Sequence, residues 1–238
     1  MVRPFDPGLI DELRAALEPA ADPAAAVAMA SYMRGMFAFL GIPSPRRRLL
    51  QSEVFKQFGR PDAEQALCVV ERLWELPQRE YQYVACDVLQ RHARLLSPAH
   101  LLRIRLLVTA KSWWDTVDAL ASHVVGTMVR QSPELSPEMD KWVRDDDLWL
   151  VRVAILHQLR FKQATDHERL FHYCTIQAEH RDFFIRKAIG WALREYSKTD
   201  PVAVRSFVAD HKNELSALSQ REALLHLTGR KKRAQGPA

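Results

Sequence analysis

The sequence reads Val151-Arg-Val-Ala-Ile-Leu-His-Gln-Leu-Arg160 and, 34 residues later, Ile185-Arg-Lys-Ala-Ile-Gly-Trp-Ala-Leu-Arg194. Five of the ten aligned positions hold the same residue, and both segments have the apolar spacing of an amphipathic helix. Helical repeats of about 34 to 47 residues are typical of TPR, HEAT and armadillo solenoids. No TPR signature is present, so the repeat predicts a HEAT-like fold. Chance similarity between two amphipathic helices is the competing interpretation.

The same offset relates an acidic residue to a basic one, because it places Asp118 under Arg152. Equivalent positions in a stacked repeat line up on one curved surface. Asp118 and Arg152 are therefore expected on one concave face, where Trp191 and Arg194 could join them.

Helix starts are marked by a capping residue that precedes a proline at the first helical position. They occur at Asp6-Pro7, Asp22-Pro23, Ser44-Pro45, Ser97-Pro98, Ser136-Pro137 and Asp200-Pro201. Strand patterns bounded by turn glycines are absent. We expect roughly a dozen helices in a curved all-α solenoid of about six helix pairs. One domain is predicted over residues 1–228, followed by a basic, disordered tail at 229–238.

The composition is that of a soluble globular protein. The 238 residues are 47% hydrophobic and 26% charged, and the net charge of +5 is compatible with a polyanionic partner. The three cysteines form no C-x-x-C pair, which suits a reducing cytosol. The N-terminus lacks an apolar signal segment, and the small-apolar run at 24–30 is too short to span a bilayer. We therefore expect a cytoplasmic protein without a membrane partner.

The segment Lys111-Ser-Trp-Trp-Asp-Thr-Val-Asp118 combines residues that suit a cation. Trp114 and Asp118 are four apart, so on a helix they project from one face. A carboxylate is costly in a core without a partner, whereas an indole face beside a carboxylate attracts a positively charged flat ring. Trp191 and Arg194 are three apart and share a helical face in the same way. These residues indicate a site for a cationic, phosphate-bearing ligand.

Other familiar sites are not encoded. The sequence holds no G-x-S-x-G elbow, and its scattered glycines form no phosphate-binding loop. His167 and His172 are five apart, whereas zinc proteases place two histidines one helical turn apart, so no metal is predicted. The remaining large indoles are expected to fill the core or helix junctions. They are Trp74, Trp113, Trp142 and Trp149.

Basic residues gather on or near the two repeated helices. They are Arg152, Arg160, Lys162, Arg186, Lys187, Arg194 and Lys198. Arginine side chains match phosphate oxygens, and a curved basic face suits a duplex backbone. The competing interpretation is a solvated face whose arginines pair with carboxylates such as Asp147 or Glu195. Together with the tryptophan and carboxylate cluster, the basic residues favour a nucleic acid as partner.

Five further motifs extend over most of the chain. They are Tyr32-Met-Arg to Phe39-Leu-Gly-Ile-Pro-Ser-Pro-Arg-Arg-Arg48, Leu73-Trp-Glu-Leu-Pro-Gln-Arg-Glu-Tyr-Gln82, Lys111 to Asp118, Asp147-Leu-Trp-Leu-Val-Arg-Val-Ala-Ile-Leu156, and Phe183-Phe-Ile to Leu193-Arg-Glu-Tyr196. Together they resemble the AlkD-type alkylpurine DNA glycosylases, whose HEAT-like domain has a basic concave face. The resemblance implies removal of N3- and N7-alkylated purines from double-stranded DNA, with no metal or cofactor. It also implies a nucleoid-associated location, and we expect a monomer.

The resemblance implies a role for each matching residue. The family's catalytic aromatic and acidic positions fall on Trp114, Asp118 and Trp191. Its DNA-binding positions fall on Tyr32, Arg152 and Arg194, and positive charge is kept where the family has lysines, at Arg160 and Lys162.

The implied chemistry suits these residues. Alkylation makes the purine cationic and a good leaving group, so no general acid is required. Asp118 can stabilise the oxocarbenium-like sugar and orient a water, while Trp114 and Trp191 favour the charged lesion. No lysine is placed for a Schiff base, which favours a monofunctional enzyme.

Two other functions stay open from the sequence. A non-catalytic HEAT-like protein that binds bent, branched or damaged DNA would keep Arg152 and Arg194 but would not need Asp118. A HEAT-like scaffold for protein interactions would have little affinity for DNA, which a salt-titrated binding measurement would reveal.

Overall fold

The computed structural model describes residues 3–5 and 8–227, and the prediction of an all-α, HEAT-like fold is confirmed. Within those ranges the only β-type pairings are two isolated bridges, Arg3 with Phe58 and Ala38 with Gln78. The helices form two compact units, one that ends at Arg103 and one that begins at Ile104. No helix in the described ranges is long and apolar enough to cross a membrane.

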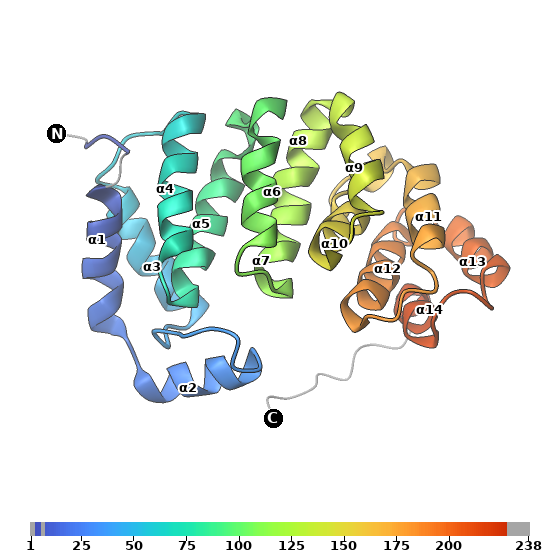
Figure 1. Cartoon of the computed structure of the whole chain (residues 1–238), viewed down its shortest axis with the longest axis horizontal. Coiled ribbons are helices and arrows are strands. Elements are labelled where there is room, and N and C mark those ends of the chain that lie inside the picture. The colour runs from blue at the N-terminus through green and yellow to red at the C-terminus, as the bar shows by residue number, and fades with distance from the viewer. Residues whose placement is uncertain (1–2, 6–7, 228–238) are drawn as a thin grey trace. The chain divides into compact units, whose positions relative to one another are not determined.

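The first unit is built from helices α1 to α5. They are α1 (Gly8–Leu17), α2 (Pro23–Tyr32), α3 (Ser44–Phe55), α4 (Ala63–Glu75) and α5 (Arg79–His92), and α6 (Leu101–Thr109) spans the boundary. Helix α1 packs on α3, and α4 lies beside α5 (Figure 1). Leu9, Leu13 and Leu17 recur at helical spacing on α1 and are completely buried, so they supply the apolar stripe of that helix.

A buried carboxylate fixes the loop that follows α2. Glu80 accepts backbone N–H bonds from Leu40, Gly41 and Ile42 at 2.9, 2.8 and 3.1 Å. Gly41 has a positive φ of 88°, and a Cβ there would lie 2.0 Å from the Asp22 carbonyl oxygen, so only glycine fits. The conformation of this loop is therefore fixed by the Glu80 side chain and the Asp22 backbone, both distant in the sequence.

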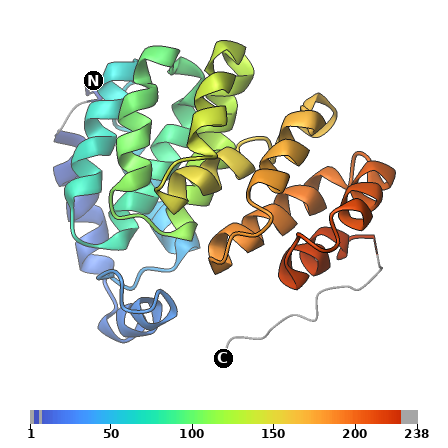
Figure 2. The same cartoon turned by 45° about the vertical axis from the view of Figure 1, so that its right-hand side comes forward.

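The second unit holds the remaining helices. Its helices are α7 (Trp114–Ala119), the π-helical turn η4 (Leu120–Val125), α8 (Gly126–Gln131), α9 (Ser136–Trp142), α10 (Leu148–Leu156), α11 (His167–Ile176), α12 (Phe183–Tyr196), α13 (Pro201–Asp210) and α14 (Ala217–Leu224). Helix α7 packs against α10, α10 against α12, and α12 against α14 (Figure 2).

Hydrogen bonds between successive layers preserve the repeat seen in the sequence. Gln177 Nε2 donates to the Val143 carbonyl at 2.6 Å across 34 residues. Ser219 Oγ donates to the Arg186 carbonyl at 3.0 Å across 33 residues. Layers one repeat apart are therefore in contact, as a HEAT-like stack requires.

The expected helix starts are correct where aspartate precedes proline in the described chain. Asp22 accepts N–H bonds from the first turn of α2, and Asp200 does the same for α13. The expectation is wrong at Ser44 and Ser136, which are the first helical residues, so their prolines occupy the second position. Proline is tolerated there because first-turn N–H groups have no partner within the helix.

The helix start expected at Ser97-Pro98 is also confirmed. Ser97 forms a capping box with His100 at the start of a short 3-10 helix. Trp74 and Trp142 are buried, which confirms their core role. Asp6-Pro7 and the basic tail at 229–238 lie outside the described residues.

Candidate nucleic-acid site

Helix α7 positions the central pair of the predicted site. The backbone of Trp113 is extended, and α7 begins at the next residue, Trp114. Asp118 follows one turn later, so Trp114 and Asp118 share a helical face as expected. Both side chains are partly buried.

Asp118 is held by Arg152 of α10 through two parallel hydrogen bonds. Arg152 Nε donates to Asp118 Oδ1 at 2.7 Å, and Arg152 Nη2 donates to Asp118 Oδ2 at 2.8 Å. Arg152 is only 4% exposed, and its Nη1 donates to the Phe184 carbonyl of α12. The guanidinium therefore joins three successive layers, and the two charged residues are the ones that the 34-residue offset aligns.

The ionisation of Asp118 reflects two opposing effects. Burial raises the pKa of this carboxyl group above its ordinary value, and the charged hydrogen bonds from Arg152 partly offset that rise. A bidentate guanidinium favours the carboxylate, so Asp118 carries negative charge toward whatever occupies its open side.

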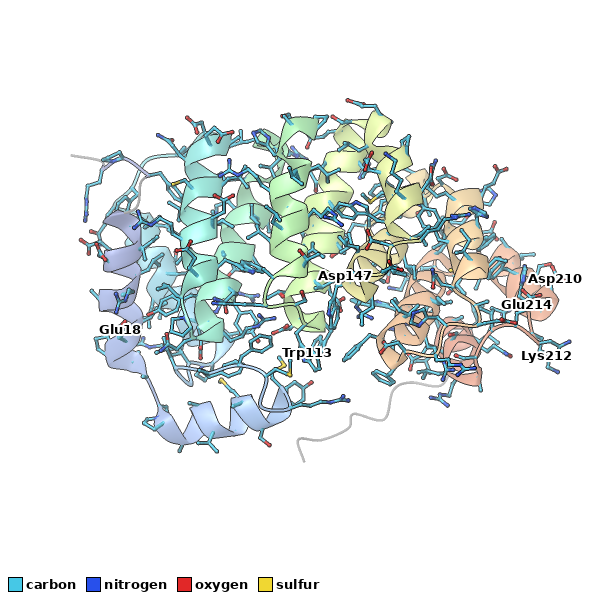
Figure 3. The ribbon with its side chains drawn as sticks, in the orientation of Figure 1. Glu18, Trp113, Asp147, Asp210, Lys212 and Glu214 are labelled. Carbon is cyan, nitrogen blue, oxygen red and sulfur yellow. The ribbon has the colours of Figure 1, made fainter. Side chains whose placement is uncertain are left out.

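Aromatic rings pack around this ion pair. Trp113, Trp149 and Phe184 lie with their ring centroids 5.0 to 5.8 Å apart, and the Arg152 guanidinium lies 6.0 Å from the Phe184 ring. The expectation that Trp113 and Trp149 fill a helix junction is confirmed. Trp113 lies at the start of α7 and Asp147 at the start of α10 (Figure 3), and Asp147 caps α10 by accepting the Trp149 N–H.

The helix changes its register directly after Asp118. The π-helical turn η4 occupies Leu120–Val125, between α7 and α8. Ser122 Oγ donates to the Asp118 carbonyl at 2.8 Å, and Thr127 Oγ1 donates to the His123 carbonyl at 2.7 Å. Short π-helical turns occur frequently at functional sites.

A hollow of about 340 Å³ opens beside Asp118. Its walls come from α7 and η4, from the turn after α10, and from α12. The lining residues are Asp118, Ala119, Ser122, His123, Leu159, Arg160, Trp191 and Glu195. The structure thus brings together three of the predicted residues, Asp118, Trp191 and Arg160, and Arg160 is exposed.

Sequence reasoning did not assign Ser122 or His123 to the site. Both lie in the π-helical turn, for which the sequence carries no recognised signal. Burial and the nearby Arg160 charge lower the pKa of His123, so its imidazole is neutral near neutral pH.

Five predicted residues lie outside the set that lines this hollow, and one of them is Arg152, which contacts it only through its ion pair with Asp118. Trp114 lies one turn before Asp118, Lys162 is exposed beside a neighbouring hollow of about 160 Å³, and Arg194 lies further along α12. Tyr32 belongs to the first unit, at the end of α2, and is 73% exposed.

Arg152 and Arg194 do not pair with the carboxylates that the solvated-face interpretation suggested. Arg194 Nη1 donates to Glu222 Oε2 at 2.8 Å, and Lys187 donates to the other oxygen of Glu222 at 2.8 Å. Glu195 instead accepts from Lys198. Arg152 and Arg194 are therefore paired within the protein, but Asp147 and Glu195 were the wrong partners. Helix α10 packs against α7, which places Asp118 beside Arg152, and α12 packs against α14, which places Glu222 beside Arg194.

No group of three or more His, Cys, Asp or Glu residues in the described ranges is arranged to hold a metal ion.

Comparison with known proteins identifies the family. The family described as "DNA alkylation repair enzyme" matches residues 13–227. Among solved structures, the chain is similar to one described as a predicted DNA alkylation repair enzyme from Enterococcus faecalis, with 32% sequence identity and a TM-score of 0.81. The similarity covers 88% of this chain and 98% of that one. No curated protein sequence was found to match. The chain belongs to the DNA alkylation repair enzyme family.

Proposed function

We propose that this repair enzyme is a DNA glycosylase that hydrolyses the N-glycosidic bond of cationic N3- or N7-alkylated purines in double-stranded DNA. The observation that carries the proposal is a carboxylate, Asp118, held by two hydrogen bonds from Arg152 at the edge of a hollow that also contains Trp191. A fixed negative charge beside an indole is complementary to a cationic base attached to a sugar that becomes cationic.

The reaction follows from where positive charge moves. Alkylation places the charge on the purine, so the base leaves as a neutral molecule and requires no general acid. As the bond stretches, the charge passes to the deoxyribose, and the Asp118 carboxylate stabilises it. Arg152 keeps the carboxylate in one orientation before the substrate arrives, which avoids reorganisation during the reaction. This chemistry requires neither a metal nor a cofactor.

Trp191 supports selection of the charged lesion. Its indole lines the same hollow as Asp118, and an indole face attracts a cationic ring by about 0.5–2 kcal/mol. Trp114 lies one helical turn from Asp118 and is the second candidate for this contact. Both rings would bind a cationic base more tightly than a neutral one.

The exposed basic side chains are the best candidates for contacts with the DNA backbone. Arg160 lies at the edge of the hollow and Lys162 beside the neighbouring one, and both are exposed. Arg194 is less accessible, with a side chain 19% exposed and paired with Glu222, so it would have to exchange that partner for a phosphate. Tyr32, which is exposed, is retained as a DNA-binding residue of the first unit.

The proposed enzyme releases the base without cutting the strand. None of the residues lining the hollow beside Asp118 is a lysine, and a Schiff base with the abasic sugar requires an amine there. Water is therefore the proposed nucleophile. Separately, the enzyme is proposed to act as a monomer.

The direct test is incubation of the protein with a duplex that carries one 7-methylguanine. Free 7-methylguanine should appear in the supernatant, and the DNA strand should remain intact until alkali cleaves the abasic site. A duplex with unmodified guanine is the control. Tight binding to the duplex without release of any base would instead favour the non-catalytic DNA-binding function.

A further inference from the structure

The π-helical turn η4 supplies two of the residues that line the hollow, Ser122 and His123. In an α-helix, two residues five positions apart are separated by about 1.4 turns and point in different directions. In a π-helical turn the backbone bonds run from residue i to i+5, so residues five positions apart lie nearly above each other. Asp118 lies in α7, just before η4 begins, and His123 lies within η4, five positions later; both line the same hollow.

The His123 ring has unused hydrogen-bonding capacity. Within the described part of the chain no protein group hydrogen-bonds either ring nitrogen, and the side chain is only half-buried. The carbonyl of His123 is occupied by Thr127 Oγ1, which fixes the backbone at this point. One nitrogen of a neutral imidazole accepts a hydrogen bond and the other donates one, so the ring is suited to a water molecule in the hollow.

Both oxygens of Asp118 are already engaged by the protein. They accept charged hydrogen bonds from Arg152, at 2.7 and 2.8 Å. These bonds occupy one acceptor position on each oxygen, which limits how the carboxylate can hold a water molecule. A second group is therefore useful to accept the proton that water must lose, while Asp118 faces the sugar.

We propose that His123 is a catalytic residue that holds the attacking water and accepts its proton, an inference that rests on the proposed glycosylase function. The bond between C1′ and the purine nitrogen breaks, and its electron pair leaves with the purine, which becomes neutral. The water oxygen forms a bond to C1′, and one water proton passes to the free nitrogen of His123. The imidazolium then releases that proton to solvent.

The charges around His123 favour this role. Arg160 lines the hollow from the turn after α10 and opposes protonation of the ring, whereas Asp118 on α7 and Glu195 on α12 favour it. Arg152 on α10 neutralises much of the Asp118 charge through their ion pair. Burial is the largest cause of the lowered pKa of His123, and the charge of Arg160 lowers it further.

The test measures single-turnover release of 7-methylguanine from duplex DNA by His123→Ala and His123→Gln. His123→Ala should release base about tenfold to a hundredfold more slowly, because general-base assistance is lost. Duplex affinity should stay within about twofold, and added imidazole should restore part of the rate in His123→Ala only. His172→Ala is the matched control, because His172 is exposed and lines no part of the hollow, and it should be unaffected by the substitution and by imidazole.

The pH profile gives a second readout that a structural role would not change. In the wild-type protein the rate should fall as the pH drops through the lowered pKa of His123, since the imidazolium cannot accept a proton. In His123→Gln this part of the acid limb should be missing, and only the titration of Asp118 should remain.

The outcomes separate the two proposals. Normal rates in both His123 variants, together with an inactive Asp118→Asn variant, would overturn the role of His123 and leave the glycosylase intact. A slow His123→Ala variant that imidazole does not rescue, with an unchanged pH profile in His123→Gln, would also overturn it. A wild-type protein that releases no base would overturn the glycosylase proposal and the role of His123 with it.

Discussion

Replacement of Arg152 by alanine should have two effects: it should destabilise the second unit, and it should inactivate the proposed site. The substitution removes two hydrogen bonds to Asp118 and one to the Phe184 carbonyl, and it leaves a carboxylate with a side chain only 14% exposed. Loss of one partner of a buried ion pair costs about 3–5 kcal/mol, and solvent screening is slight here because both groups are largely buried. For a chain of this size the melting temperature should fall by roughly 10 °C.

Thermal unfolding and DNA binding at several salt concentrations would be measured on the same Arg152→Ala preparation. The slope of log affinity against log salt should not change, because the guanidinium is occupied by Asp118 rather than presented to a phosphate. The double variant Asp118→Leu/Arg152→Met should recover part of the lost stability, since it removes both buried charges. A salt slope lower by about 0.9 with an unchanged melting temperature would refute this reasoning and assign Arg152 to a DNA phosphate, as the family resemblance implies.

Three further predictions concern other residues of the second unit. Arg160→Ala should lower the salt slope by about 0.9 with little change in melting temperature, because the side chain is exposed, and an unchanged slope would contradict a phosphate contact. Trp191→Ala should slow excision of a stably cationic lesion more than that of a neutral one, and equal losses in rate would show that the ring is structural. His157 is completely buried and its pKa is lowered to about 4, so the folded protein holds this imidazole in its neutral form. Its contribution to the free energy of unfolding is therefore largest above pH 6.5 and is lost as the pH falls toward 4. Urea unfolding across that range should show about 3 kcal/mol of this loss in the wild type and much less in His157→Gln, and equal slopes would contradict the assignment.

The fold was predictable because its signals are local or periodic. Asp22 and Asp200 cap their helices within three residues of their own position, which a single sequence reveals. The 34-residue repeat also predicted one contact between distant residues, because equivalent positions of a stacked repeat lie side by side and Asp118 is equivalent to Arg152.

The rest of the site depends on packing that the sequence does not record. Glu222 reaches Arg194 only because α14 packs against α12, and no spacing rule selects Glu222 over the adjacent Glu195. The π-helical turn that brings His123 to the hollow has residues that also suit an ordinary α-helix. Such a turn is a property of the assembled helices, so His123 could be read as a site residue only from the structure.

The most direct test of the proposed reaction compares the wild-type protein with Asp118→Asn, in single-turnover release of 7-methylguanine from duplex DNA. The asparagine has the same shape but cannot stabilise a cationic sugar, so the rate should fall by more than about a hundredfold while duplex affinity stays within a few-fold. A rate for Asp118→Asn close to that of the wild type would show that this carboxylate does not act on the glycosidic bond.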